Sequence, residues 1–304
     1  MEKFDVNILG CGSAIPTTRR NPSSQVINLR DKLYMIDCGE GAQVQMRKMK
    51  LKYNRLNHIF LSHLHGDHCL GLIGLISTMG MVENGGELVI HAHPDAEKLF
   101  RPHLDYFCAD LPFSVRFNGI APQKHELIFE DRSIEVYSIP LRHRVPSCGF
   151  LFKEKEKSRH IIPEMTAFHQ VPKAYYNLLK GGADYVKPTG EIIKNSLLTK
   201  SLDPVRKYAY CSDTAYSERI IPIIEGVDTL YHEATFCEKE KPRAKETMHS
   251  TAKQAATIAK AAGVGKLLLG HYSARYHDLN PILTEAKSVF ENSFLVQDGY
   301  TFKI

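Results

Sequence analysis

The stretch FLSHLHGDHCLGLIG, residues 60–74, decides the fold because it places metal-binding side chain types at the end of a buried strand. An apolar run before them predicts a strand at 58–62, and one after them has the length of a helix over 69–79. Within six residues stand His63, His65, Asp67 and His68. Four such groups buried as packing would need many hydrogen-bond partners, whereas they can supply half of each of two metal sites. The stretch therefore predicts a metal centre.

Three more titratable side chains follow apolar runs later in the chain. They end the segments YSIPLRH, YAYCSD and KLLLGH, and they are His143, Asp213 and His271. Each could alone be a satisfied residue at the rim of a sheet. Together with the first four they make seven, the number expected for two metals that share one carboxylate and a hydroxide. A second His-x-His pair, in HAHPD at 91–95, has no such neighbours, and we predict no metal there.

Strands and helices alternate in both halves of the 304-residue chain, which predicts a layered α/β fold. The 43% of apolar residues can supply a core for one large domain or two smaller ones. Helices are expected at 42–51 and at 250–263, the second capped by Ser250 and ended by Gly263. Strands are expected at 4–9, 25–29, 32–37, 58–62, 87–93, 134–141, 207–212, 229–234 and 266–271.

Composition narrows the setting in which the protein works. Seven cysteines without a Cys-x-x-Cys pair predict free thiols and a reducing compartment, which we take to be the cytoplasm. The start, MEKFDVNILG, lacks the apolar segment of a secretory signal, and the longest nearly apolar stretch, 69–82, is too short to span a membrane. The net charge of +5 permits a polyanionic partner without requiring one.

One segment, residues 153–200, interrupts the alternation and reads as an insertion. It is rich in Lys, Gly and Pro and carries nine basic residues against five acidic ones, so it holds most of the net charge. Charge alone leaves two interpretations open, a solvated loop or an arm that binds a polyanion.

Several motifs resemble those of ribonuclease Z, the branch of the metallo-β-lactamase superfamily that processes tRNA 3′ ends. The resembling blocks are LGCGSAIPTTRRNPSS at 9–24, IDCGEGAQVQM at 36–46, HEATF at 232–236, MHSTAKQAATIAKAAG at 248–263 and LLLGHYSARY at 267–276. The resemblance runs over nearly the whole chain, and the pairing of HEATF with HSTA is more specific than the His-x-His-x-Asp-His signature. The resemblance implies a single αββα sandwich domain, 1–304, with a flexible tRNA-binding arm inserted at about 153–200.

The resemblance also implies two zinc ions per subunit, although manganese or iron suits the same ligands. One zinc is held by His63, His65 and His143, the other by Asp67, His68 and His271, and Asp213 bridges them. It further implies that His249 protonates the leaving group with support from Glu233, and that Asp67 takes a proton from the attacking water. From the residues alone, His249 could instead be a helix N-terminal residue and Glu233 an exposed carboxylate.

Two groups of residues are candidates for substrate contacts. The opening loop carries Arg19, Arg20 and Asn21, which could attract the RNA backbone or form an ordinary basic loop. Arg275, with Ser273 beside it, could hold the scissile phosphate or form a structural ion pair.

The insertion departs from the family pattern. Where many bacterial members have a Gly-Pro pair, this chain has VPKAYYNLLKGGADY at 171–185. Tyr175 and Tyr176 could stack on RNA or form the arm's own small core.

We therefore predict a zinc-dependent endoribonuclease that removes the 3′ trailer from precursor tRNA, leaves a 3′-hydroxyl and works as a homodimer. Two alternatives stay open. A phosphodiesterase, arylsulfatase or lactonase of the same fold would act on small molecules and would not need a basic insertion. A non-catalytic RNA-binding protein would not need the full ligand set.

Overall fold

Two compact units divide the chain in the computed structural model, which describes residues 2–82, 85–200 and 204–304. Residues 2–153 and 206–304 form one unit, here called the body, and residues 154–205 form the other, here called the arm.

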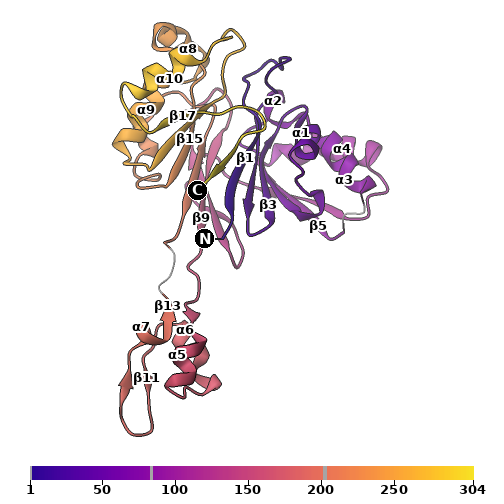
Figure 1. The fold of residues 1–304 in the computed structure, drawn as a ribbon. Helices are drawn as coiled ribbons and strands as arrows, with labels where there is room; N and C mark the ends of the chain where they lie inside the picture. Colours follow the sequence, from indigo (N-terminus) through magenta and orange to yellow (C-terminus); the bar gives the residue numbers. More distant parts are fainter. Residues whose placement is uncertain (1, 83–84, 201–203) are drawn as a thin grey trace. The chain divides into compact units, whose positions relative to one another are not determined.

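The body contains two seven-stranded sheets (Figure 1). The first has the order β18(Thr301–Lys303), β1(Phe4–Gly10), β2(Ser24–Leu29), β3(Lys32–Cys38), β4(Leu56–Phe60), β5(Glu87–Ala92), β6(Ser114–Gly119). The second has the order β17(Ser293–Leu295), β16(Lys266–Gly270), β15(Thr229–Glu233), β14(Lys207–Cys211), β9(Cys148–Glu154), β8(Ile134–Pro140), β7(Leu127–Glu130). From β3 to β6 and from β14 to β17 neighbouring strands run parallel, so their carboxyl ends share one edge of each sheet.

Side chains of the first sheet alternate between two apolar layers, as the two-residue period of a strand requires. In β3, Tyr34 and Ile36 join the cluster that also holds Phe150 of β9 and Leu268 of β16, whereas Met35 joins the cluster under the first group of helices. That group is α1(Ala42–Lys48), α3(Leu72–Met81) and α4(Asp95–Phe107). Helices α8(Lys241–Thr247), α9(Ala252–Ala261) and α10(Asn280–Lys287) lie on the second sheet's side (Figure 1). The predicted α/β fold with an αββα arrangement is confirmed.

The predicted strands are all present, with ends that differ by up to two residues, but three helix predictions need correction. The helix expected over 42–51 ends at Lys48. The helix expected over 69–79 is two helices, the short α2(Gly66–Cys69) and then α3. The cap of α9 is Thr251, whose side chain accepts from Gln254 in a capping box, and not Ser250. Ser250 instead donates its hydroxyl to the carbonyl of Thr214 at 2.6 Å. Gly263 follows α9 with a φ of 60°, the left-handed conformation expected there.

The arm has a small core of its own. Its elements are β10(His160–Ile161), α5(Pro163–Phe168), η2(Lys173–Tyr175), α6(Tyr176–Lys180), β11(Tyr185–Val186), β12(Ile192–Ile193), α7(Asn195–Leu198) and β13(Thr199–Lys200). Strand β10 pairs with β13 and β11 with β12. The core consists of Val171, Leu179, Tyr185, Ile193 and Leu198.

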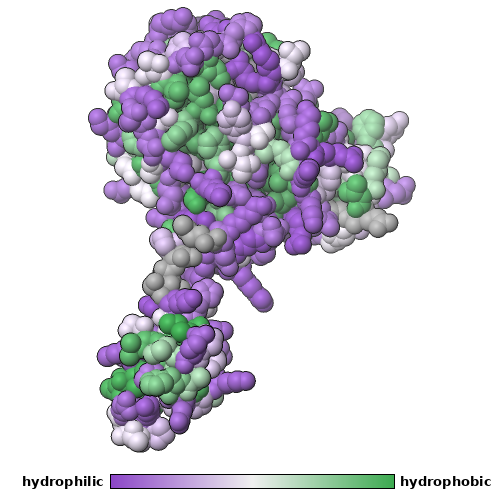
Figure 2. All heavy atoms as spheres, viewed as in Figure 1, coloured by the Kyte–Doolittle hydropathy of each residue, from purple (hydrophilic) through white to green (hydrophobic). Residues whose placement is uncertain are grey.

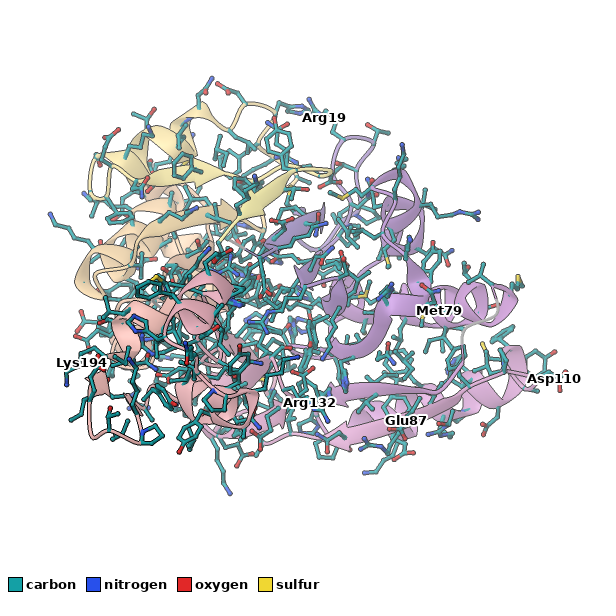
Figure 3. All side chains as sticks on the ribbon, turned by 60° about the horizontal axis from the view of Figure 1, so that its bottom comes forward. Arg19, Met79, Glu87, Asp110, Arg132 and Lys194 are labelled. Carbon is teal, nitrogen blue, oxygen red and sulfur yellow. The ribbon has the colours of Figure 1, made fainter. Side chains whose placement is uncertain are left out.

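Tyr175 and Tyr176 of the arm differ in exposure. Tyr176 packs against this core, whereas Tyr175 is 38% exposed with its ring 5.0 Å from that of Tyr185. Lys194, labelled in Figure 3, pairs with Asp184 at 2.9 Å. Figure 2 shows apolar side chains among the hydrophilic ones on the arm's surface.

The other short helices of the body are η1(Tyr53–Arg55), η3(Glu218–Ile220) and η4(Glu238–Glu240). All seven cysteines are buried and free, as predicted. In the part of the chain that the structure describes, no helix combines the length and the apolar character needed to cross a membrane.

Candidate metal centre

The candidate ligands follow strands of both sheets, most of them in loops, and Asp67 and His68 in the short helix α2. His63 and His65 follow β4, and His143 follows β8. Asp213 and His271 follow β14 and β16, which run parallel to β15 between them. Because the carboxyl ends of parallel strands meet at one edge of a sheet, side chains far apart in the sequence come together there.

The backbone is left-handed at three positions of this edge. Asp37, Asp213 and His271 have φ values of 55°, 58° and 57°. Residues other than glycine rarely adopt this conformation, and it costs about 1–3 kcal/mol at each position. Such conformations cluster at functional sites because the sharp turn that they make sets the direction of a side chain.

His63, His65 and His143 form the first group of candidate ligands. The Nε2 atoms of His63 and His143 lie 2.9 Å and 3.3 Å from Nδ1 of His65. Both Nε2 atoms also lie 3.6 Å from Oδ2 of Asp213. Ligand atoms about 2.1 Å from a tetrahedral ion are about 3.4 Å from one another. The four atoms are therefore spaced as the ligands of one ion would be.

Asp67, His68 and His271 form the second group. The Nε2 atoms of His68 and His271 lie 3.1 Å and 3.0 Å from Oδ1 of Asp213. They lie 3.6 Å and 3.7 Å from Oδ2 of Asp67. The two oxygens of Asp213 thus face different groups, Oδ2 the first and Oδ1 the second.

Two buried nitrogens of the second group test whether the centre suits a metal. Nε2 of His68 and Nε2 of His271 are buried, and neither makes a hydrogen bond within the described residues. A buried polar atom without a partner costs about 1–3 kcal/mol, a cost that a coordinated cation removes. Imidazole nitrogens with carboxylate oxygens are a donor set of zinc, and also of iron and manganese. The residues present therefore fit a metal-binding centre.

Asp37 supports the second group from the protein interior, and the sequence analysis missed it. Its Oδ2 lies 2.7 Å from Nδ1 of His68 and accepts the hydroxyl of Tyr210 at 2.7 Å. Its Oδ1 accepts the backbone N–H of Ser62 at 2.7 Å. The bond to Asp37 holds the proton of His68 on Nδ1 and leaves the Nε2 lone pair for a cation. In the sequence, Asp37 stands out only as the acidic residue of the motif IDCGEG at 36–41. The motif does not show that this residue contacts His68.

The HEATF segment supports the other side of the second group. Nδ1 of His271 donates to the hydroxyl of Thr235 at 2.9 Å, and that hydroxyl donates to Oε2 of Glu233 at 2.5 Å. In the first group, Nδ1 of His143 donates to the carbonyl of Met248 at 3.1 Å. Both imidazoles are thereby fixed with Nε2 toward Asp213.

Glu233 is fully buried, so the alternative that it is an exposed carboxylate is wrong. Its Oε1 lies 3.0 Å from Nδ1 of His249 and accepts the N–H of Thr214 at 2.6 Å, and its Oε2 accepts the N–H of Ser250 at 3.1 Å. Burial alone would lower the pKa of His249, but the charge of Glu233 outweighs it and raises that pKa to about 9.

His249 borders both ligand groups. Its ring centroid lies 5.2 Å from that of His143 and 5.4 Å from that of His271. One of its nitrogens is also within 4.8 Å of ligand atoms of Asp213 and His271.

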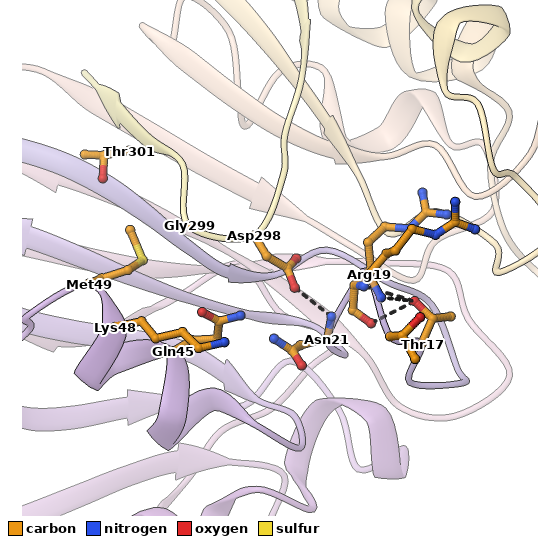
Figure 4. A pocket seen from close by; sticks show the side chains of 11 residues that line it. Thr17, Arg19, Asn21, Gln45, Lys48, Met49, Asp298, Gly299 and Thr301 are labelled. Atoms are coloured by element: carbon orange, nitrogen blue, oxygen red, sulfur yellow. Dashed lines mark hydrogen bonds between the residues drawn. The ribbon is translucent and has the colours of Figure 1, made fainter.

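The opening loop reaches this centre at a residue that the sequence analysis did not single out. The backbone N–H of Ala14 donates to Oδ2 of Asp67 at 2.7 Å. Arg19, Arg20 and Asn21 line a separate cavity of about 690 Å³, shown in Figure 4, and none of the seven candidate ligands lines it. There the N–H of Asn21 donates to Asp298 at 2.7 Å. The structure therefore does not bring these three side chains directly to the ligand groups.

Arg275 is linked to His249 through the ring of Phe236. Nε of Arg275 donates to the hydroxyl of Ser273 at 3.1 Å, and the guanidinium lies 5.1 Å from the ring centroid of Phe236. That ring is 6.2 Å from the ring of His249. No carboxylate among the described residues pairs with Arg275, so the structural ion pair considered from the sequence is absent there.

Comparisons with known proteins agree with this geometry. A family model described as anti-Pycsar protein Apyc1 matches residues 4–165, and this part of the chain belongs to that family. The protein "Ribonuclease Z" of Parabacteroides distasonis is 59% identical over 304 residues, which cover 100% of both chains. That of Bacteroides fragilis is 55% identical over 299 residues, 98% of each chain.

Solved structures show the same fold. The short form of human tRNase Z superposes with a TM-score of 0.70 at 24% identity, covering 98% of both chains. The metallo-β-lactamase fold protein YhfI of Bacillus subtilis also gives 0.70, at 19% identity and with 100% of both chains covered.

The fold places the chain in the class of proteins with the metallo-β-lactamase fold, and its described residues bring together His–Asp groups that could hold metal ions. Within this class, the relatives that match the chain over its full length at more than half identity are named ribonuclease Z. The chain belongs to the ribonuclease Z family.

Proposed function

We propose that this chain is a zinc-dependent endoribonuclease that removes the 3′ trailer from precursor tRNA and leaves a 3′-hydroxyl on the tRNA. The observation that carries the proposal is Asp213, which turns one oxygen to each of two ligand groups in a chain of the ribonuclease Z family. Phosphodiester hydrolysis builds negative charge on the transferred phosphoryl group, and paired cations stabilise such charge.

The first zinc is assigned to His63, His65 and His143, the second to Asp67, His68 and His271, and Asp213 is shared. When bound, two such cations supply the positive charge for the transition state and lower the pKa of water at the site. The same ligands accept manganese or iron. Asp67 lies at the edge of this centre, where its carboxylate takes the proton of the attacking water.

His249 donates a proton to the oxygen that leaves on the tRNA side. Its Nδ1 is bound to the buried carboxylate of Glu233, so the proton on Nε2 is available to the cleft. Glu233 is a positioning residue, held in turn by the backbone N–H groups of Thr214 and Ser250.

Substrate contacts are assigned to two places on the body. Arg275, with Ser273, contacts the scissile phosphate, because its guanidinium lies over Phe236 near His249. Arg19, Arg20 and Asn21 contact RNA farther from the cut, in the cavity of Figure 4, where Lys48 adds another positive charge.

The arm binds the folded body of the tRNA. Its own core fixes a surface on which basic residues stand beside exposed apolar ones, and Phe168 at 77% and Tyr175 at 38% exposed can stack on bases. In this proposal, residues 171–185 of the arm take the place of the Gly-Pro pair that many bacterial members of the family have.

A homodimer in the cytoplasm completes the proposal. Exposed apolar side chains lie at the carboxyl end of α3 and along α4, and exposed apolar surface is of the kind that a second subunit covers. They are Met81, Val82, Leu99, Tyr106 and Phe107. Figure 2 shows apolar residues on the part of the body where Figure 1 places these helices.

The test is incubation of the purified protein, with zinc or manganese, with a precursor tRNA that carries a 3′ trailer. One cut after the tRNA body that leaves a 3′-hydroxyl is the expected result. A small chromogenic phosphodiester serves as a parallel substrate. Hydrolysis of the small diester alone would reject the RNA assignment and favour a small-molecule hydrolase of the same fold.

A further inference from the structure

A second cleft of the body begins at the first ligand group. It has a volume of about 800 Å³, and most of its wall comes from residues 140–147, the loop that follows β8. His143 lines it, so the cleft opens directly beside the proposed metal centre. Among the described residues that line it, none is acidic.

Three arginines dominate this cleft. Arg142 and Arg144 come from the loop and Arg219 from η3, and all three are exposed. Within the described residues none of the three has a carboxylate partner.

The loop holds its arginines on a fixed backbone. The N–H of Arg142 donates to the hydroxyl of Thr214 at 3.2 Å, and its carbonyl accepts the N–H of Ala215 at 2.8 Å. The N–H of Leu141 donates to the carbonyl of Ser147 at 3.3 Å, which closes the loop. A fixed backbone lowers the entropy lost when a ligand binds.

Ser147 adds an independent sign of a ligand. Ser147 is 3% exposed and lines the cleft. Its hydroxyl oxygen makes no hydrogen bond within the described residues. A buried hydroxyl without a partner is costly, and it can donate to an oxygen that enters the cleft.

We propose that this cleft binds a phosphate of the RNA strand adjacent to the scissile phosphate. The inference deepens the proposed nuclease function and rests on it. Guanidinium groups bind phosphate through paired N–H donors, and the lining offers three of them without a competing carboxylate. The phosphate can belong to the trailer or to the tRNA side of the cut, and both present the same chemistry.

The test measures the binding of precursor tRNA to the metal-loaded protein by fluorescence anisotropy at several salt concentrations, with His249→Ala present in every variant to slow cleavage. We expect Arg142→Ala/Arg144→Ala to weaken binding about tenfold at moderate salt. Each lost phosphate contact should also reduce the slope of log affinity against log salt by about 0.7. Arg219→Ala should reduce this slope by a similar amount. Arg144→Lys should keep most of the wild-type slope because the positive charge remains.

Arg132→Ala is the matched control. Arg132, labelled in Figure 3, is also an exposed arginine, but it precedes β8 whereas the cleft loop follows that strand. It should bind as the wild type does. If the double variant has the affinity and salt slope of this control, the cleft does not bind phosphate and the inference is wrong.

Trailer length distinguishes the two sources of the phosphate. A precursor with a single trailer nucleotide has no trailer phosphate beyond the scissile one. If the cleft binds the trailer, the double variant weakens binding only of precursors with long trailers, and if it binds the tRNA side, it weakens both. Failure of the metal-loaded wild type to cut precursor tRNA would instead overturn the function on which the inference rests.

Discussion

Asp37 and His68 form a fully buried acid–imidazole pair, with Oδ2 of Asp37 2.7 Å from Nδ1 of His68. The pair joins the end of β3 to the short helix α2, thirty-one residues along the chain. It sets which nitrogen of His68 faces the centre, because a carboxylate acceptor fixes the proton on Nδ1. Thus a residue outside the ligand set determines whether one of the ligands can bind a cation.

Changing Asp37 to Asn should weaken metal binding about tenfold to a hundredfold while the protein stays folded, since loss of such supporting carboxylates has effects of this size. Calorimetric titration of the metal-free protein with zinc measures the change in metal affinity. Tyr210→Phe removes a donor to the same carboxylate without touching the histidine, so its effect should be smaller. Equal affinities in wild type and Asp37→Asn would show that the pair does not act on the metal.

His65→Ala and Asp213→Ala should each lose bound metal and lower the cleavage rate about a hundredfold or more, because each removes a charged or coordinating group at the reacting centre. Metal analysis gives the stoichiometry, and circular dichroism checks the fold. Full cleavage by either folded variant would reject the assignment. Asp213→Asn, which tolerates the left-handed backbone at this position, controls for strain.

His249→Ala should keep two metals per chain and lower kcat by about 10²–10⁴, the usual contribution of a general acid. Single-turnover kinetics on precursor tRNA measures the loss. Because His249 lies within reach of Asp213 and His271, the competing possibility is that it is itself a ligand. Loss of one metal in the variant would establish that role instead. Glu233→Gln should give a smaller loss with both metals retained.

Deletion of the arm should abolish tRNA cleavage and spare hydrolysis of a small diester. The two strands that carry it form an antiparallel pair in which Lys153 lies opposite Lys207, so a short turn between Glu154 and Arg206 can close the gap. Comparing kcat/KM for both substrates is the measurement. Equal loss on both would mean that the arm supports the body rather than the RNA.

Removal of metal should destabilise the body. A cation present at about a thousand times its Kd contributes about 4 kcal/mol, which corresponds to roughly 5–15 °C in Tm for a chain of this size. Thermal unfolding of the holoprotein with and without EDTA, followed by addition of zinc, measures the shift and its reversal. An unchanged Tm would mean that the two buried imidazole nitrogens of the second group find partners without a metal.

Most of the fold could be read from the sequence because the strands are short apolar runs bounded by turn residues. The seven candidate ligands were found for the same reason, since each stands just after such a run. What the sequence could not give was spatial pairing across the sheets. Asp37 and Thr235 look like ordinary residues until the fold puts them behind His68 and His271. The arginines of the cleft were missed because only the fold joins η3 to the loop after β8.

The left-handed backbone at Asp37, Asp213 and His271 makes the centre a place where this protein gives up stability for activity. Glycine would relieve that conformation at little steric cost, but Asp37→Gly would also leave the N–H of Ser62 and the hydroxyl of Tyr210 without their buried acceptor. The strain at this centre therefore cannot be removed by a single substitution without breaking the hydrogen bonds that hold the ligands. A thermostable variant of this protein is best sought among its surface loops, with these three positions held fixed.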